Sequence, residues 1–256
     1  MARTLFSPAA NGPVKTWQRM LRKLLPKDRT FWKVYAPVIR ILRDSREHQL
    51  IREKMSKYLD LGKEDVVLEE GCGRGIWLAE ITGKVRYAVG LDVDPGMIKA
   101  AWAAAPQADF VRHDLNQGIP FRNESFSRIG SILVEGYLRN REIARAERFR
   151  VLQPGGMLAI VTPRRGAKFF KVLKAEARQR KEERTVIENL KKLPLAIIAI
   201  IFGKIAELKA VVGDWHFYEK DELADFYRSG GFEIVACEPV YADQAWLLIV
   251  RKPSIN

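Results

Sequence analysis

Glycines and carboxylates follow a short apolar segment in a pattern that can bind a nucleoside. The stretch VVLEEGCGRG, residues 66 to 75, runs from an apolar strand into two glutamates and then into Gly71, Gly73 and Gly75. Glycines at this spacing let the backbone turn sharply and come close to a ligand. Since the following IWLAEIT has helical apolar spacing, the turn also directs a helix N-terminus toward that ligand.

Two further carboxylates lie where the next strands are expected to end. The segment YAVGLDVD places Asp92 about twenty residues after the glycine turn, where a carboxylate can accept hydrogen bonds from both hydroxyls of a ribose. Asp114 follows another short apolar run, ADFVRHDL. The third glycine comes two residues after the second and not three, and this spacing argues against a dinucleotide.

The remaining elements predict a sheet flanked by helices. An apolar strand is expected at 129–134, a helix at 139–151, and a turn followed by a fifth strand in VLQPGGMLAIVTP. A helix at about 219–229 should end at Gly230 and Gly231 and lead into two final strands. This order of elements indicates an α/β domain.

Taken in order, the segments LEEGCGRG, GLDVDPGMI, HDLNQGIPFRNESF and RVLQPGGMLAIVTP resemble the class I S-adenosylmethionine-dependent methyltransferases. The resemblance is in particular to the subgroup that includes ubiquinone, menaquinone and bacterial phospholipid N-methyltransferases, over roughly residues 31–163 and 215–251. The resemblance implies a Rossmann-like, doubly wound, seven-stranded sheet with an N-terminal helical extension and a helical insertion after the fifth strand. It also implies S-adenosyl-L-methionine as the cofactor.

The resemblance assigns roles to residues along these motifs. Glu69 would lie near the methionine end of the cofactor, Asp92 would hold the ribose hydroxyls, Met97 would pack on the adenine and Asp114 would accept from the adenine amino group. Carboxylates and a thioether suit these contacts. Cys72 has the small side chain that the turn requires. The full set of expected cofactor contacts is Glu69, Gly71, Cys72, Gly73, Asp92, Val93, Met97, Asp114 and Leu115.

The catalytic residues are less well defined. Many relatives have a histidine after the fourth strand, whereas this chain reads VEGYLRN there. The candidates for proton removal are His216, Tyr35 and Glu135. His216 precedes the helix at 219–229, so it could instead satisfy the start of that helix. An amine acceptor needs no dedicated base, but a phenol or an activated ring carbon must lose a proton.

Basic charge is concentrated in two segments outside the motifs. The formal net charge is +13, and residues 15–58 hold 13 basic against 4 acidic residues, while residues 164–210 hold 13 against 5. We therefore expect additions to a neutral-to-acidic catalytic body. The predicted organisation is an extension at 1–58, a cofactor-binding core at 59–163, a helical insertion at 164–214 and a C-terminal helix and hairpin at 215–256.

Both additions are amphipathic. Trp17, Met20, Leu21, Leu24 and Leu25 form an apolar stripe beside basic residues, a pattern typical of a helix in a lipid interface. The apolar run 193–202 is far shorter than the roughly 20 residues that span a bilayer. The N-terminal stripe could instead pack on the domain, and the insertion could be a lid, a subunit interface or a membrane contact.

Cysteine and histidine usage excludes other classes. The two cysteines provide no disulfide framework, and three scattered histidines have no metal-ligand spacing. We expect a cytoplasmic, peripherally membrane-associated methyltransferase that acts on a hydrophobic or lipid-like acceptor, either a quinone precursor or an aminophospholipid, with an anionic membrane surface as its partner. The alternatives are an RNA methyltransferase and a non-catalytic S-adenosylmethionine-binding protein. The sequence leaves the oligomeric state open.

Overall fold

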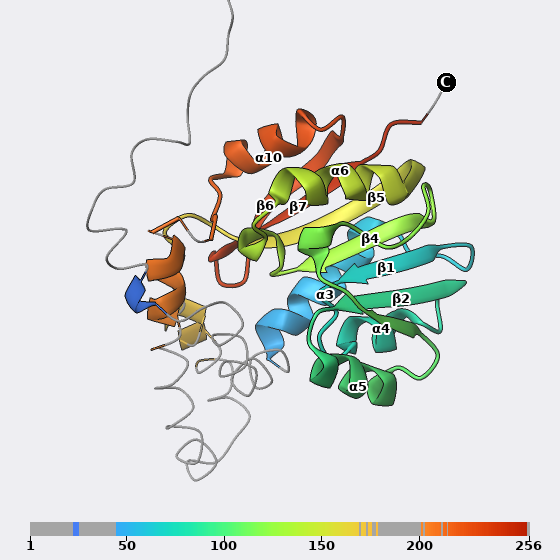
Figure 1. Ribbon diagram of the computed structural model, residues 1–256, viewed down its shortest axis with the longest axis horizontal. Helices are drawn as coiled ribbons and strands as arrows, with labels where there is room; N and C mark the ends of the chain where they lie inside the picture. The colour runs from blue at the N-terminus through green and yellow to red at the C-terminus, as the bar shows by residue number, and fades with distance from the viewer. Residues whose placement is uncertain are drawn as a thin grey trace, which may run out of the picture.

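A single mixed sheet forms the centre of the protein (Figure 1). The computed structural model describes residues 23–25, 45–168, 170–172, 174–175, 178, 201, 203–210, 212–213 and 215–254. The strand order is β3-β2-β1-β4-β5-β7-β6, and β7 is antiparallel to both of its neighbours. The strands are β1 Val66–Glu70, β2 Tyr87–Asp92, β3 Asp109–Arg112, β4 Phe126–Ile132, β5 Leu152–Pro163, β6 Glu233–Val240 and β7 Ala245–Arg251. This arrangement confirms the predicted Rossmann-like, doubly wound, seven-stranded sheet.

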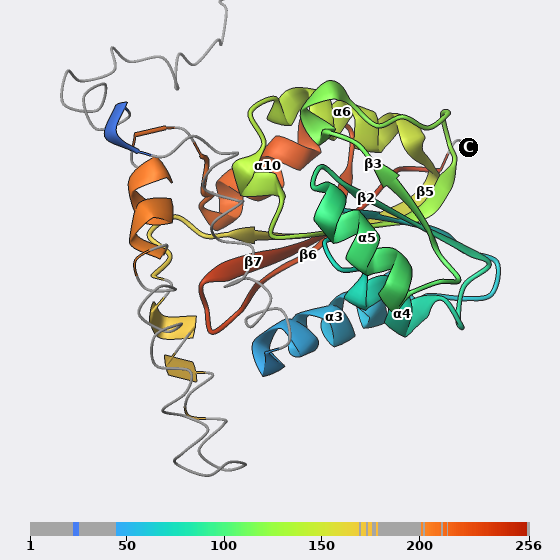
Figure 2. The same ribbon diagram turned by 60° about the horizontal axis from the view of Figure 1, so that its bottom comes forward.

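Helices cover both faces of the sheet (Figures 1 and 2). Successive side chains along each strand point to opposite faces of the sheet and so belong to two hydrophobic cores. Val67 of β1 lies in one cluster and Leu68 in the other. One cluster includes residues of α3, α4 and α5, and the other includes residues of α6 and α10. These helices are α3 Arg46–Leu59, α4 Ile76–Ile81, α5 Pro95–Ala104, α6 Arg141–Val151 and α10 Lys220–Arg228.

Helix α3 is part of the core, whereas the predicted organisation places most of it in the N-terminal extension. Its Ile51, Met55 and Leu59 are buried in the same cluster as Trp77 of α4. In addition, Trp77 donates a hydrogen bond from Nε1 to the Ser56 hydroxyl at 2.8 Å. The division predicted at residue 58 therefore falls inside a helix that packs on the sheet.

The fourth strand begins and ends earlier than its apolar run. Strand β4 stops at Ile132 because Leu133 has a left-handed backbone, with φ of 56°. Leu133 still donates its N–H to the Val161 carbonyl at 2.7 Å, and the chain then enters the short 3₁₀ helix η2, Glu135–Tyr137. This turn brings η2 over the carboxyl ends of the strands.

The insertion after β5 is described only in part. In both ribbon views the helical residues 203–210 lie beyond the end of the sheet at which β5 finishes. Ile205 and Ala206 of this helix pack against the buried Trp215. No helix within the described residues is long and apolar enough to cross a bilayer. The predicted N-terminal stripe lies outside the described residues except for Leu24 and Leu25.

Candidate active site

The glycine turn after β1 has the conformation that its sequence requires. Gly71 and Gly73 have φ of 60° and 54°, in the left-handed region that favours glycine. A Cβ on Gly71 would lie 2.4 Å from the Val134 side chain, so a larger residue does not fit there. The N–H of Cys72 donates to the Leu91 carbonyl at 2.9 Å and ties the turn to β2.

Asp92 holds this turn from the end of β2. Its Oδ2 accepts from the Gly73 N–H at 2.9 Å, and its Oδ1 accepts from the Asp94 N–H at 2.9 Å. Each carboxylate oxygen has two lone pairs, so Asp92 can still accept from the hydroxyls of a diol. The backbone hydrogen bonds therefore fix the carboxylate at the position predicted for the ribose.

Asp114 ends the chain segment after β3 and begins the 3₁₀ helix η1, Leu115–Gln117. Its Oδ1 accepts from the backbone N–H of Asn116 at 3.0 Å and from the side-chain amide of Asn116 at 2.8 Å. Because both hydrogen bonds use Oδ1, Oδ2 is the oxygen with capacity for a ligand amino group.

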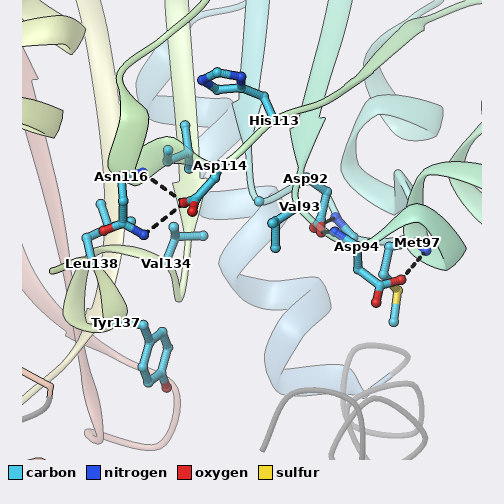
Figure 3. Close-up of a pocket in the computed structure, with 13 residues that line it drawn as sticks. Asp92, Val93, Asp94, Met97, His113, Asp114, Asn116, Val134, Tyr137 and Leu138 are labelled. Atoms are coloured by element: carbon cyan, nitrogen blue, oxygen red, sulfur yellow. Dashed lines mark hydrogen bonds between the residues drawn. The ribbon is translucent and has the colours of Figure 1, made fainter. Parts of the chain in front are cut away.

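The two carboxylates lie on opposite sides of one pocket, which Figure 3 shows at the ends of neighbouring strands. Tyr137 stands at one margin of this pocket, and Met97 lies at the opposite margin. The lining residues are Gly71, Gly73, Asp92, Val93, Asp94, Met97, His113, Asp114, Leu115, Asn116, Val134, Tyr137 and Leu138. The structure thus brings together most of the predicted cofactor contacts.

Two predicted contacts do not line the pocket. Glu69 and Cys72 are both buried, with exposed fractions of 4% and 3%. The Cys72 side chain belongs to the hydrophobic core, and its sulfur is so close to Gly90 that a Cβ there would lie 2.7 Å away. The Cys72 side chain therefore packs in the core, in agreement with the small side chain expected in the turn, and contacts of Glu69 and Cys72 with the cofactor stay predictions.

Sequence reasoning missed six lining residues: Asp94, His113, Asn116, Val134, Tyr137 and Leu138. Asp94, His113 and Asn116 each lie next to a predicted contact, in the segments that follow β2 and β3. That position was the available signal, since ligands of open α/β sheets bind in the crevice at these ends. Tyr137 and Leu138 reach the pocket because the chain turns at Leu133, and no local sequence motif predicts this turn.

The lining fits an adenosyl ligand. Glycines with positive φ leave room for close approach, two carboxylates face a shared space, and Met97 provides a soft apolar surface. A family model described as "Methyltransferase domain" matches residues 68–160, which hold the glycine turn and both aspartates. Residues 68–160 thus match a methyltransferase domain, and they lie in a seven-stranded sheet of the class I methyltransferase fold.

Curated relatives of this methyltransferase domain have diverse names. A probable S-adenosylmethionine-dependent methyltransferase of Mycolicibacterium smegmatis is 30% identical over 47% of this chain and 45% of its own. An 18S rRNA (guanine-N(7))-methyltransferase of Mus musculus is 32% identical over 39% of this chain and 37% of its own. A demethylmenaquinone methyltransferase of Listeria welshimeri is 30% identical over 44% of this chain and 51% of its own. The chain thus spans about half the length of these relatives or less.

Solved structures share the fold. The Burkholderia thailandensis 1,6-didemethyltoxoflavin-N1-methyltransferase, solved with its substrate and S-adenosylhomocysteine, has a TM-score of 0.59 at 14% identity. The alignment covers 97% of this chain and 94% of that one. At this identity the likeness concerns the fold of the methyltransferase domain.

The predicted base Glu135 is committed to a buried network. It is fully buried, forms an ion pair with Arg148 and accepts hydrogen bonds from Tyr218 and Tyr227, both at 3.0 Å. It does not line the cofactor pocket of the methyltransferase domain. We therefore correct this assignment: the contacts give Glu135 a structural role. Tyr35, another candidate, lies outside the described residues.

His216 lies close to the cofactor pocket without lining it. Its backbone N–H donates to the Gly136 carbonyl of η2 at 2.9 Å, and its Nε2 lies 2.6 Å from Glu222 Oε1 in the first turn of α10. The half-buried ring thus supports the start of α10, as the structural alternative predicted. It also lines a second pocket beyond η2, so a contact with substrate remains a prediction.

Proposed function

We propose that this protein transfers the methyl group of S-adenosylmethionine to a hydrophobic, lipid-like acceptor at a membrane surface. The observation that carries the proposal is the pair of carboxylates, Asp92 and Asp114, on opposite sides of a pocket that the glycine turn opens. Asp92 would bind the ribose hydroxyls and Asp114 the adenine amino group. Met97 would pack on the adenine ring.

The bound cofactor supplies an electrophilic methyl group on a sulfonium centre. The protein must then hold a nucleophile in line with that group and exclude water. Val134, Tyr137 and Leu138 form the apolar part of the pocket wall on the side of β4. These side chains would limit access of water to the reacting atoms.

A hydrophobic acceptor is supported by apolar side chains at the insertion. Phe170, Ile201 and Leu208 are 47%, 53% and 40% exposed, in a segment that is rich in lysine and arginine. Apolar side chains beside basic ones bind anionic lipid surfaces through both burial and charge. The name of the Listeria relative is compatible with a quinone precursor as the acceptor.

Sedimentation with anionic vesicles tests the membrane part of the proposal. The full chain should sediment with vesicles that contain phosphatidylserine, less so at high salt, and removal of residues 1–27 should lower the bound fraction. Ile201→Asp together with Leu208→Asp should lower it as well. Ile143→Asp is the matched control, because Ile143 is 48% exposed on α6. Equal recovery of all forms in the supernatant would refute membrane binding.

A second candidate is methylation of RNA, which the name of the mouse relative favours. Clustered basic residues neutralise phosphates as well as lipid headgroups. Incubation with labelled S-adenosylmethionine and separate lipid and RNA fractions distinguishes the two. Label in RNA alone, together with steeply salt-dependent RNA binding and no vesicle binding, would reverse the ranking.

A further inference from the structure

A second pocket adjoins the cofactor pocket. It is lined by residues that include Arg165, Lys168, Trp215, His216 and Phe217. The two pockets share a wall of aromatic rings. Tyr137 of the cofactor pocket meets the Trp215 ring edge to face, with centroids 4.7 Å apart, and it lies 6.0 Å from the Phe217 ring. The two pockets therefore meet at the rings of Tyr137, Trp215 and Phe217.

His216 is held in one orientation at this pocket. The backbone hydrogen bond to Gly136 fixes the residue, and Nε2 faces Glu222 Oε1 at 2.6 Å. Glu222 is itself fixed, because its Oε2 forms an ion pair with Arg165 at 2.5 Å. An ionised carboxylate only accepts hydrogen bonds, so the nitrogen that faces Glu222 must carry the hydrogen. In the neutral ring, Nδ1 is then the nitrogen that can accept a proton.

Burial and two nearby arginines disfavour the protonated form of His216. Burial lowers its pKa below the usual value, Arg141 of α6 lowers it further, and these effects outweigh the opposing effect of Glu222 on α10. Arg165 after β5 acts in the same direction as Arg141. The Tyr218 ring packs on the other side, 4.5 Å from the imidazole. A neutral imidazole with an oriented Nδ1 is suited to general-base chemistry.

We propose that the second pocket binds the acceptor through an aromatic ring that carries a hydroxyl group, and that His216, positioned by Glu222, removes the proton of that hydroxyl. This inference rests on the proposed function and specifies its acceptor. The partly buried rings of Phe217 and Tyr137 offer faces and edges for an aromatic ligand, and both pack against the buried Trp215. The positive charge of the exposed Lys168, which lines the same pocket, stabilises the negative charge of the phenolate that forms.

Proton transfer from the acceptor precedes methyl transfer. The O–H bond of the acceptor breaks, its electron pair stays on oxygen, and the proton goes to the imidazole. The oxygen then uses a lone pair to form the O–CH₃ bond, while the electron pair of the S–CH₃ bond remains on sulfur and gives neutral S-adenosylhomocysteine. The imidazolium releases its proton to solvent.

A chromophoric phenol tests the proposal without turnover. The full chain is saturated with S-adenosylhomocysteine and titrated with 4-nitrophenol, whose phenolate absorbs in the visible, at a pH where the free phenol is mostly protonated. We expect saturable binding and phenolate absorbance from the wild type. His216→Gln should bind the phenol but lose most of the phenolate signal. Glu222→Gln should move the appearance of phenolate to higher pH by about one unit, because removal of a carboxylate partner lowers the imidazole pKa.

Controls separate this inference from the proposed function. His48→Gln is the matched substitution on α3, outside both pockets, and should behave as the wild type. Absence of saturable phenol binding, or an undiminished phenolate signal in His216→Gln, would overturn the inference. If calorimetry shows that the wild type does not bind S-adenosylhomocysteine, the proposed function fails instead.

Discussion

Arg148 and Glu70 form an ion pair that is completely buried between α6 and the end of β1. Nε of Arg148 donates to both carboxylate oxygens of Glu70 at 2.9 Å, and Nη2 donates to Oε2 at 2.6 Å. Nη1 of the same guanidinium donates hydrogen bonds to the Glu135 carboxylate and the Tyr227 hydroxyl. Burial lowers the pKa of Arg148, but Glu70, Tyr227 and Glu135 raise it well above its usual value. One cation thus links β1, η2 and α10 beneath the active site.

Removal of this cation should destabilise the fold strongly. Arg148→Met leaves the carboxylates of Glu70 and Glu135 buried without their counter-charge, and we expect a loss of about 3–5 kcal/mol in the free energy of unfolding. Urea denaturation measures it. Arg228→Met is the control, since Arg228 is exposed and pairs with Asp225 on the surface of α10, where loss of an ion pair costs about 1 kcal/mol or less. Equal losses in the free energy of unfolding for the two variants would contradict the special contribution of the buried ion pair.

The carboxylates of the cofactor pocket should contribute separately to cofactor affinity. Asp92→Asn and Asp114→Asn each weaken a charged hydrogen bond to the ligand, worth about 1.5–3 kcal/mol, so we expect Kd for S-adenosylhomocysteine to rise at least about tenfold. Isothermal titration calorimetry measures it. Asp225→Asn on α10 removes a carboxylate remote from the pocket and should leave Kd unchanged. Wild-type affinity in both pocket variants would remove the basis of the assigned roles.

Gly71→Ala should damage both the turn and the pocket. The new Cβ would lie 2.4 Å from Val134 Cγ2, and a φ of 60° costs a non-glycine residue about 1–2 kcal/mol. We expect a lower urea midpoint and weaker binding of S-adenosylhomocysteine. Gly83→Ala is the control, because a Cβ at Gly83 meets no atom within 4 Å. A Gly71→Ala protein with unchanged stability and affinity would show that the turn tolerates a side chain.

His216 should make stability depend on pH in the mildly acidic range. Burial and Arg141 lower its pKa, so between that lowered pKa and the usual value near 6.5 the unfolded chain binds more protons. Stability from this group is complete above about pH 6.5 and declines as the pH falls through that window. Urea midpoints at several pH values should therefore fall less steeply for His216→Gln than for the wild type. Parallel curves for the two proteins would indicate that folding does not change the pKa of His216.

The sequence by itself determined the succession of strands and helices along the cofactor-binding part and the residues at the strand ends. Each of these features is local: a run of apolar residues, then Gly71 or Asp92, then a helix. In a parallel sheet the carboxyl ends of neighbouring strands meet at one edge, and the resemblance to the methyltransferases implied that Asp92 and Asp114 bind the same ligand there.

Only the tertiary structure decided which partners Glu135, Arg148 and His216 contact. Glu135 is a glutamate next to the predicted site, and nothing in its neighbours along the chain shows that it meets Arg148, Tyr218 and Tyr227 in the interior. The same holds for His216 and the wall between the two pockets. Whether a carboxylate is a base or half of an ion pair depends on burial and on partners distant in sequence, and the packing of the sheet against α6 and α10 sets both.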